Sequence, residues 1–190
     1  MLPIKYFLRG KGYTCHNISY EHNGNLEQCI ESVNRQLAHT IRLFETPLII
    51  IGQSLGGLIG SQLHKHGWNI QQLIAIASPL HGARFIGEIE QKVKRCVNET
   101  TEKLLRKLLI RKVYNDLRDL AESDPELAEP PHAYHTISTS WGNGDFDGCV
   151  YRDETIITPE NHTHIPWSDH RFILFSWRLL CVIHKVMQDN

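Results

Sequence analysis

A serine flanked by glycines is the first feature of this sequence that could do chemistry. The hexapeptide Gly52-Gln-Ser-Leu-Gly-Gly57 follows an apolar run, Leu48 to Ile51, and precedes a segment with the pattern of a helix. A serine on a tight turn between a buried strand and a helix is raised above the edge of the sheet, and glycines let the two elements approach closely. The helix N-terminus then faces the reacting carbonyl oxygen, and the backbone N–H of Leu55 would be one oxyanion donor. The pattern therefore predicts Ser54 as a nucleophile.

An acid that orients a catalytic base is expected later in the chain, because a serine hydroxyl is a weak nucleophile without such a pair. The Gly-rich segment 141–150 follows a predicted strand at Tyr134 to Ser138. Residues of a site tend to follow the carboxyl ends of strands in such sheets. Asp147 is favoured as the acid because Gly148 and an apolar pair follow it, with Asp145 as the second candidate and Glu154 as the third.

The base is predicted among three histidines in the next loop of the chain. His170 is favoured, because it stands just before the apolar stretch that begins at Phe172 and could reach back over the edge of the sheet; His164 and His162 are the alternatives. The pair His162-x-His164 also has a spacing found in metal sites. No cysteine or carboxylate stands at a ligand spacing from it, so neither a metal ion nor another cofactor is expected.

The elements that must position these residues alternate between strands and helices. Apolar residues at spacings of three and four predict amphipathic helices, and short continuous apolar runs predict strands that are covered on both faces. The alternation predicts an α/β doubly wound architecture, with a mostly parallel sheet and helices on both faces. The predicted strands are Gly12 to Tyr20, Leu48 to Ile51, Leu73 to Ala77 and Tyr134 to Ser138, and the predicted helices are Asn25 to Leu43, Leu55 to His66 and Phe172 to Val186.

A long helical stretch, Glu88 to Leu120, is predicted between the last two of these strands. Its first part, 88–112, holds eight basic and four acidic residues. One interpretation is a surface helix pair with a solvated basic face, and the other is a lid over an active site that is drawn toward anionic lipid surfaces. We expect residues 88–128 to form a helical cap inserted in a single domain, 1–190.

Composition narrows the class of protein. The chain has 190 residues, 41% of them apolar, and 20 Lys and Arg nearly match 21 Asp and Glu. One soluble domain is therefore expected, and the lack of a basic excess argues against a dedicated nucleic-acid binder. No apolar run is long enough to span a bilayer, and the N-terminus lacks the order of a signal peptide. Five scattered cysteines indicate a reducing compartment, so a cytoplasmic location is favoured, although three Asn-x-Ser/Thr triplets point the other way.

These motifs resemble those of the α/β-hydrolase lipases and esterases over roughly residues 5 to 188. The hexapeptide is similar to the family's Gly-His-Ser-Met-Gly-Gly, with Gln53 at the place of the usual histidine. The segment Ala77-Ser-Pro-Leu-His-Gly82 resembles the family's Thr-Pro-x-x-Gly-Ser segment after the next strand. Asp147-Gly-Cys-Val150 is similar to the family's acid loop, and Asp169-His-Arg-Phe172 with the following Ile-Leu is similar to its base segment.

The resemblance implies a mechanism in which Ser54 attacks an ester carbonyl, His170 accepts and returns the proton, and Asp147 orients the imidazolium. It implies a small-molecule ester or a lipid as substrate, and it places the helical stretch where lipases carry lid helices. Two other functions are compatible with the same residues. One is a thioesterase or deacylase that removes acyl groups from proteins, and the other is a catalytically impaired scaffold that binds a membrane or a protein through the basic helix 88–112. The expected substrate pocket comprises Gln53, Leu80 and Phe85, with Ile86 beside them.

The start of the chain departs from the family's pattern. Members carry, before the segment that matches Gly12, a strand that ends in a His-Gly loop and then a helix, and that loop supplies the second oxyanion N–H. Only 11 residues precede Gly12, and Arg9-Gly10 is the nearest match to the dipeptide. We therefore expect a shortened N-terminus, with a truncated reading frame, an oxyanion hole built in another way, or weak catalysis.

Overall fold

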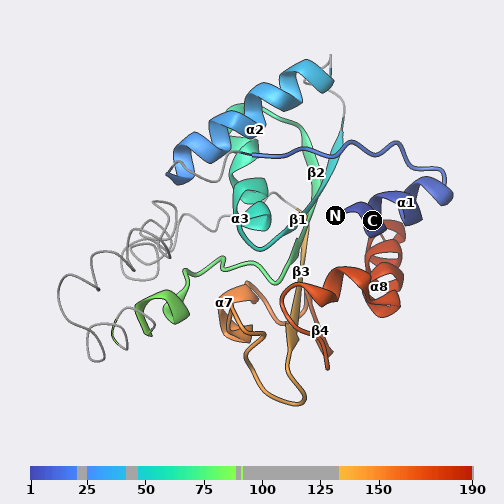
Figure 1. Ribbon diagram of the computed structural model, residues 1–190. Coiled ribbons are helices and arrows are strands. Elements are labelled where there is room, and N and C mark those ends of the chain that lie inside the picture. Colours follow the sequence, from blue (N-terminus) through green and yellow to red (C-terminus); the bar gives the residue numbers. More distant parts are fainter. Residues whose placement is uncertain (21–24, 42–46, 89–90, 92–132, 190) are drawn as a thin grey trace.

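A four-stranded parallel sheet lies at the centre of the computed structural model (Figure 1). The structure describes residues 1–20, 25–41, 47–88, 91 and 133–189. Each strand pairs in parallel with the next one along the chain, so the order across the sheet is also the order in sequence. The strands are β1 (Leu48–Gln53), β2 (Ile70–Ile76), β3 (Tyr134–Ser140) and β4 (His162–Pro166). All four carboxyl ends therefore meet at one edge of the sheet.

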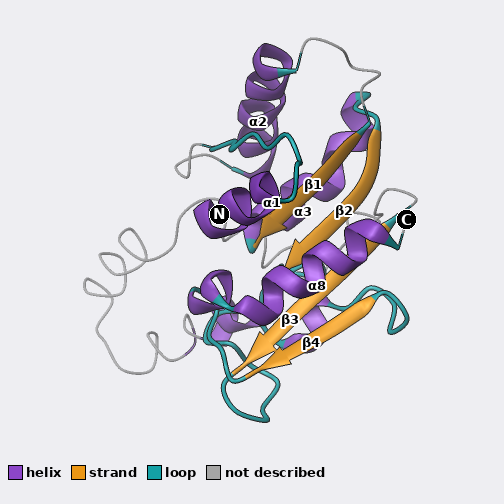
Figure 2. Cartoon of the chain, turned by 90° about the vertical axis from the view of Figure 1, so that its right-hand side faces the viewer, coloured by secondary structure: helices purple, strands orange, loops and turns teal. Residues whose placement is uncertain are grey.

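Helices cover both faces of this sheet (Figures 1 and 2). On one face lie α2 (Leu26–Thr40) and α3 (Leu55–Gln62), and on the other lie α1 (Leu2–Gly10) and α8 (Trp177–Gln188). The predicted arrangement of a mostly parallel sheet between two helical layers is thus confirmed. Short helical turns complete the described elements: a 3-10 turn at Leu63–His66, α7 (Arg152–Thr155) and a 3-10 turn at Phe172–Phe175.

Local signals in the sequence set where the helix before Ser54 begins and where the helical segment after Ser54 ends. The Asn25 side chain accepts the N–H of Gln28 at 2.9 Å, and the Gln28 side chain accepts the N–H of Asn25 at 3.1 Å. This capping box starts α2 at the predicted place. The helical segment after Ser54 ends at Gly67, whose φ of 82° is the left-handed conformation that glycine adopts without strain.

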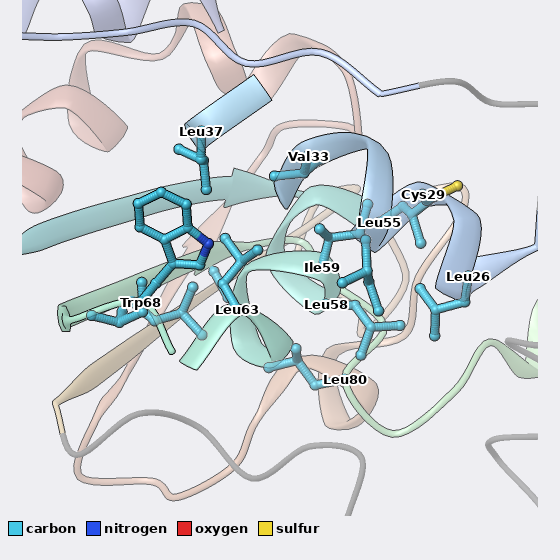
Figure 3. Packing of buried hydrophobic residues seen from close by; sticks show 14 of the residues in the cluster. Leu26, Cys29, Val33, Leu37, Leu55, Leu58, Ile59, Leu63, Trp68 and Leu80 are labelled. Carbon is cyan, nitrogen blue, oxygen red and sulfur yellow. The ribbon is translucent and has the colours of Figure 1, made fainter. Parts of the chain in front are cut away.

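The core is divided by the sheet into two layers, and β2 contributes to both. Leu73 and Ala75 pack in the layer with α2 and α3, whereas Ile74 and Ile76 pack in the layer with α1 and α8. This alternation explains why β2 is a continuous apolar run, since both of its faces are covered. Figure 3 shows the first layer, where side chains of α2 and α3 interlock around Leu58, Ile59 and Leu63.

Residues 12–20, predicted as a strand, are not part of the sheet. They form an extended segment that leads from α1 to α2 past the edge of β1, with no ladder partner among the described residues. The alternation and β-branched content of this segment are typical of a strand, but a strand also needs a neighbour at hydrogen-bonding distance. A cavity separates these residues from β1, and this is the physical reason for the wrong prediction.

The last third of the chain contains two further corrections. His162 and His164 lie on a strand, β4, and not in a loop as expected. The predicted single helix from Phe172 to Val186 is two elements, because the 3-10 turn at Phe172–Phe175 is followed by an extended residue, Ser176, before α8 begins. The predicted helical stretch Glu88 to Leu120, and with it the cap 88–128, lies almost wholly outside the described residues. No helix within the described ranges is long and apolar enough to cross a membrane.

Candidate active site

Ser54 occupies a strained turn between β1 and α3. Its φ is 54° and its ψ is −128°, a conformation that costs a residue with a Cβ on the order of 1–3 kcal/mol. The backbone N–H of Ser54 donates to the carbonyl of Ile76 at 2.8 Å, which fixes the turn to the end of β2. The serine therefore stands where the sequence places it, directly between the strand and the helix.

Two of the three glycines around Ser54 make this turn possible. A Cβ on Gly52 would lie 2.3 Å from the carbonyl oxygen of Gly56, and a Cβ on Gly57 would lie 2.1 Å from the Ser78 hydroxyl. A Cβ on Gly56 would meet nothing within 4 Å. The close approach of β1, α3 and the end of β2 therefore depends on Gly52 and Gly57, while Gly56 has room for a side chain.

Gly52→Ala and Gly56→Ala form a matched pair of substitutions. We expect Gly52→Ala to lower the free energy of unfolding by about 1–3 kcal/mol, because backbone must move to admit the new methyl group. Gly56→Ala is expected to change it by less than about 1 kcal/mol, since the space is open and alanine favours a helix. Urea denaturation of both variants measures the difference. Equal losses of stability would contradict the packing described for Gly52.

Asp147 and His170 are held together by two hydrogen bonds. His170 Nδ1 lies 2.7 Å from Asp147 Oδ2, and the His170 backbone N–H donates to the Asp147 carbonyl at 3.0 Å. The other carboxylate oxygen, Asp147 Oδ1, accepts the N–H groups of Cys149 at 2.8 Å and Val150 at 2.7 Å. The Asp147 side chain is 1% exposed and that of His170 is 13% exposed. Because a carboxylate only accepts, the proton of a neutral His170 ring belongs on Nδ1, which leaves Nε2 as an acceptor.

The two other acid candidates have different partners. Asp145 is exposed and its carboxylate lies 3.9 Å from the Arg152 guanidinium. Glu154 is buried, and its side chain accepts the backbone N–H of Arg84 at 2.7 Å and that of Tyr151 at 2.8 Å. Burial raises the pKa of Glu154, although these donors act against the rise. Glu154 therefore ties α7 to the segment that follows β2, and the acid that contacts His170 is Asp147.

Gln53 connects the end of β1 to the segment that carries His170. Its side-chain amide donates to the backbone carbonyl of His170, across 117 positions of sequence. No pattern in the sequence indicates this bond. The role of Gln53 in a substrate pocket stays a prediction. The residue next to Ser54 thus fixes the main chain of His170 at the same edge of the sheet.

Backbone strain gathers at this edge. Three non-glycine residues within the described ranges have a positive φ: Ser54 at 54°, Ala77 at 46° and Trp167 at 65°. Each directly follows a strand, β1, β2 and β4 respectively. Strained conformations concentrate at functional sites, and ligands of open α/β sheets bind outside the carboxyl ends of the strands. The distribution of strain therefore marks the edge that carries Ser54, independently of any sequence motif.

Exposed tryptophans flank the loop that carries Asp147, and no pattern in the sequence marks them as part of a site. Trp141 is 64% exposed and Trp167 is 75% exposed. The Trp167 ring lies against Gly142, where a Cβ would be 3.6 Å away, and the Trp141 indole nitrogen would lie 3.6 Å from a Cβ on Gly148. Both indoles thus lie beside glycines of this loop while most of the surface of each tryptophan faces solvent.

The remaining predicted site residues lie as follows. The N–H of Leu55 belongs to the first residue of α3, and within the described ranges no acceptor meets it. Leu80 is buried in the layer with α2 and α3. The Phe85 ring packs 5.0 Å from the Phe146 ring, next to the loop of Asp147. Arg9 ends α1, and its guanidinium donates to the Cys15 carbonyl at 3.0 Å. No group of three or more potential ligands that could hold a metal ion occurs among the described residues.

Imidazoles and hydroxyls form a hydrogen-bonded row between β3 and β4. The two ring nitrogens of His162 contact the hydroxyls of Thr136 at 2.8 Å and Ser138 at 3.0 Å. Those of His164 contact the hydroxyls of Ser138 at 2.8 Å and Ser140 at 3.1 Å. Burial, with positive charge from Arg152 and neighbouring histidines, lowers the pKa of His162 to about 4, and burial first of all lowers that of His164. Both rings are therefore neutral at pH 7.

This row predicts an acid-sensitive fold. Between about pH 6.5 and 4 the unfolded chain binds a proton at His162 that the folded chain does not, so the free energy of unfolding falls as the pH falls through this range. We expect His162→Gln to remove about 1–2 kcal/mol of that fall, allowing for partial exposure to solvent. Urea denaturation at pH 7 and pH 4.5 measures the change in the free energy of unfolding. The variant His66→Gln, at an exposed histidine, is the control. The same pH dependence in His162→Gln and in wild type would contradict the assignment.

Comparison with known proteins places this geometry in context. No protein-family model matches the chain, and no curated protein matches its sequence. Among solved structures, the mature lipase BlEst2 of Bacillus licheniformis has a TM-score of 0.67 at 13% identity, covering 97% of this chain and 82% of its own. ClbQ of the colibactin NRPS/PKS pathway has a TM-score of 0.54 at 16% identity, covering 98% and 91%. This chain has the α/β-hydrolase fold.

The similarity to the α/β-hydrolase fold extends over nearly the whole chain. The esterase EaEST of Exiguobacterium antarcticum also has a TM-score of 0.54, at 14% identity, covering 98% of this chain and 86% of its own. The expected fold class is confirmed, and identities this low speak for the fold alone. The chemistry of this chain therefore has to be argued from its own residues.

Proposed function

We propose that the chain is a serine hydrolase of carboxylic esters that acts through Ser54, His170 and Asp147. The observation that carries the proposal is the 2.7 Å hydrogen bond between His170 Nδ1 and Asp147 Oδ2, at the sheet edge where Ser54 stands on its strained turn. A nucleophile, a base and an acid that orients the base are the groups that acyl transfer requires. The similarity of the fold to lipase and esterase structures supports the same reaction class.

The reaction proceeds in two halves. Ser54 Oγ attacks the ester carbonyl carbon while its proton passes to His170 Nε2, and the N–H of Leu55 donates to the oxygen that becomes negative. The tetrahedral intermediate then breaks its bond to the alcohol, which leaves with the proton from His170. Water attacks the resulting acyl-enzyme and gives a proton to His170. The acid departs, and that proton returns to Ser54.

The hydrogen bonds around Asp147 and His170 hold the base in place before substrate arrives. Two backbone N–H groups fix one oxygen of the Asp147 carboxylate, so the other oxygen is aimed at His170 Nδ1. Gln53 holds the His170 main chain from the side of the nucleophile. Such preorganisation contributes to catalysis because the groups need not be ordered during the reaction.

The surroundings of the site favour an ester with an apolar acyl group. Trp141, Trp167 and Phe172 are each more than half exposed, and all three stand in the two segments that carry Asp147 and His170. Exposed aromatic side chains that gather near a site indicate contact with an apolar ligand or surface. We therefore propose lipid esters or long-chain esters as the substrate class.

A fluorophosphonate probe, which phosphonylates activated serines, tests the reaction class. We expect the folded protein to be labelled at Ser54 and the Ser54→Ala variant to remain unlabelled, with mass spectrometry locating the adduct. Hydrolysis of nitrophenyl esters from acetyl to octanoyl then tests the substrate class, and kcat/KM is expected to rise with chain length. Absence of labelling in a folded protein would refute the hydrolase, whereas a preference for acetyl would refute only the lipid substrate.

A further inference from the structure

The helical layer that contains α1 and α8 is rich in basic residues. Six of the 20 Lys and Arg of the chain, and none of its 21 Asp and Glu, stand in residues 1–11 and 170–188. These ranges contain α1, the 3-10 turn at Phe172–Phe175 and α8. Since the whole chain has a formal net charge of −1, this layer is far more positive than the molecule as a whole. The six basic residues are Lys5, Arg9, Lys11, Arg171, Arg178 and Lys185.

No carboxylate neutralises these six side chains within the ranges that the structure describes. The ion pairs found there involve other cations. Asp169 and Asp189 bound the second range, and the Asp169 carboxylate accepts the backbone N–H groups of Arg171 and Phe172 at 2.8 and 2.7 Å. Lys5 is half-buried and the other five basic residues are exposed. Their charges are therefore available to an anionic partner.

Large aromatic side chains stand among these charges. Tyr6, Phe172, Phe175 and Trp177 are each between 67% and 72% exposed. Phe172 and Phe175 are three positions apart in the 3-10 turn, where residues at this spacing project on the same side. Ile173, which lies between them, is fully buried and anchors the turn in the core. Exposed apolar side chains that gather in this way mark a site of interaction with a protein or a membrane.

The two helices and the turn form one continuous surface. α1 contacts both the turn and α8 on the same face of the sheet (Figures 1 and 2). The Phe7 ring of α1 meets the Trp177 ring edge to face, with 5.5 Å between the ring centres, and Lys11 Nζ lies 5.8 Å from the centre of the Phe7 ring. We call the six basic and the four exposed aromatic side chains together the basic aromatic face.

An anionic lipid surface matches both kinds of side chain. Lys and Arg are attracted to negative headgroups, and aromatic rings are stable at the boundary between headgroups and acyl chains. A second copy is a poor partner, because two positive faces repel each other when a two-fold axis brings them together. Single-stranded nucleic acids are bound in positively charged grooves, whereas Phe172 and Phe175 project from a turn.

We propose that the basic aromatic face docks the protein on anionic lipid membranes. The basic side chains bind the headgroups, and the rings of Phe172, Phe175 and Trp177 enter the boundary layer beneath them. Phe172 stands two positions after His170, so docking places the segment of His170 beside the lipid surface. The docking needs no reaction at Ser54 and is therefore independent of the proposed ester chemistry.

Sedimentation with lipid vesicles tests the docking. One set of vesicles contains phosphatidylcholine with about one quarter phosphatidylserine, and the control set contains phosphatidylcholine alone. The Ser54→Ala variant is used beside the wild-type protein, so that the result does not depend on hydrolysis. We expect at least tenfold tighter binding to the charged vesicles at low salt, and a smaller difference at high salt. Equal binding to both sets, or binding to neither, would overturn the proposal.

A pair of charge reversals locates the contact. Arg178 on α8 and Arg35 on α2 are both exposed, but the two helices cover opposite faces of the sheet. We expect Arg178→Glu to weaken binding to the charged vesicles at least fivefold and Arg35→Glu to weaken it less than twofold. Both variants have the same net charge, and circular dichroism verifies their fold. An equal loss in both, or no loss in Arg178→Glu, would place the contact elsewhere on the chain and refute the proposal.

The fluorescence of Trp177 shows whether the aromatic rings enter the lipid. Replacing Trp141 and Trp167 with phenylalanine leaves Trp177 and the buried Trp68. We expect charged vesicles with brominated acyl chains to quench the Trp177 signal by about half, and Phe175→Ala to weaken binding at least threefold. Bound protein without quenching would contradict the proposed insertion. Tighter binding of a single-stranded oligonucleotide than of charged vesicles would assign the basic aromatic face to a nucleic acid instead.

Discussion

Replacing His170 with alanine is expected to slow fluorophosphonate labelling of Ser54 by a factor on the order of 1,000, because the hydroxyl then has no group to accept its proton. The His170 ring belongs to neither apolar layer of the core, although its side chain is only 13% exposed. The variant should therefore remain folded. The labelling reaction is run at pH 8 and stopped at successive times, and mass spectrometry of these samples gives the rate. Circular dichroism verifies the fold.

His164→Ala is the control for this experiment. It also removes an imidazole near the carboxyl ends of the strands. This imidazole belongs to the hydrogen-bonded row between β3 and β4 and not to the pair of Asp147 and His170. We expect its labelling rate to stay within a factor of about three of wild type, since it makes no contact with Asp147 in this structure. Labelling that persists in His170→Ala and disappears in His164→Ala would transfer the role of the base to His164.

Asp147→Asn is expected to lower kcat for ester hydrolysis by a factor on the order of 1,000 to 10,000. An amide has one oxygen, and the two backbone donors at 149 and 150 hold that oxygen where Asp147 Oδ1 now lies. The amide nitrogen then faces His170 Nδ1. Because both groups would donate, the imidazole must move its proton to Nε2 and can no longer accept one from Ser54. Steady-state hydrolysis of a nitrophenyl ester measures the loss.

Two further variants separate this orienting role from a structural one. Asp145→Asn changes an exposed carboxylate in the same loop and is expected to leave kcat within about twofold. Asp147→Ala removes the acceptor of two backbone N–H groups as well, so it should also lower the melting temperature, whereas Asp147→Asn should not. A kcat of Asp147→Asn close to wild type would show that the acid acts elsewhere.

Features encoded within a few neighbouring residues could be predicted from the sequence. The start of α2 at Asn25, the end of the helical segment at His66 and the apolar run of β1 are all determined locally, and each is found where it was expected. Asp147 and His170 were selected from chain order and from the resemblance, and the structure shows a 2.7 Å hydrogen bond between them, while their catalytic roles stay a prediction. Propensity, capping and turn chemistry act over a few positions, so elements that depend on them can be predicted from a single sequence.

Features that depend on distant neighbours could not be predicted in this way. Segment 12–20 has the composition of a strand, yet whether it joins a sheet is decided by what lies beside it in space. β4 was overlooked because His162 and His164 are polar, and the hydroxyls that form hydrogen bonds with their rings come from another strand. The bond from Gln53 to His170 likewise cannot be predicted from the sequence, since the pairing of the whole sheet decides which residues meet there. These contacts are tertiary, and local propensity does not report them.

The contact of two exposed indoles with the loop of Asp147 gives the site an intrinsic optical reporter. Of the four tryptophans in the chain, Trp68 is buried in the layer with α2 and α3, Trp141 and Trp167 lie beside glycines of this loop, and Trp177 is exposed at the start of α8. The buried indole emits at shorter wavelength than the solvated ones, so in a Trp177→Phe variant a soluble quencher such as iodide acts first on the two indoles of the loop. Loosening of the loop on warming, or its shielding by a bound ester, is therefore recorded by fluorescence without any attached label.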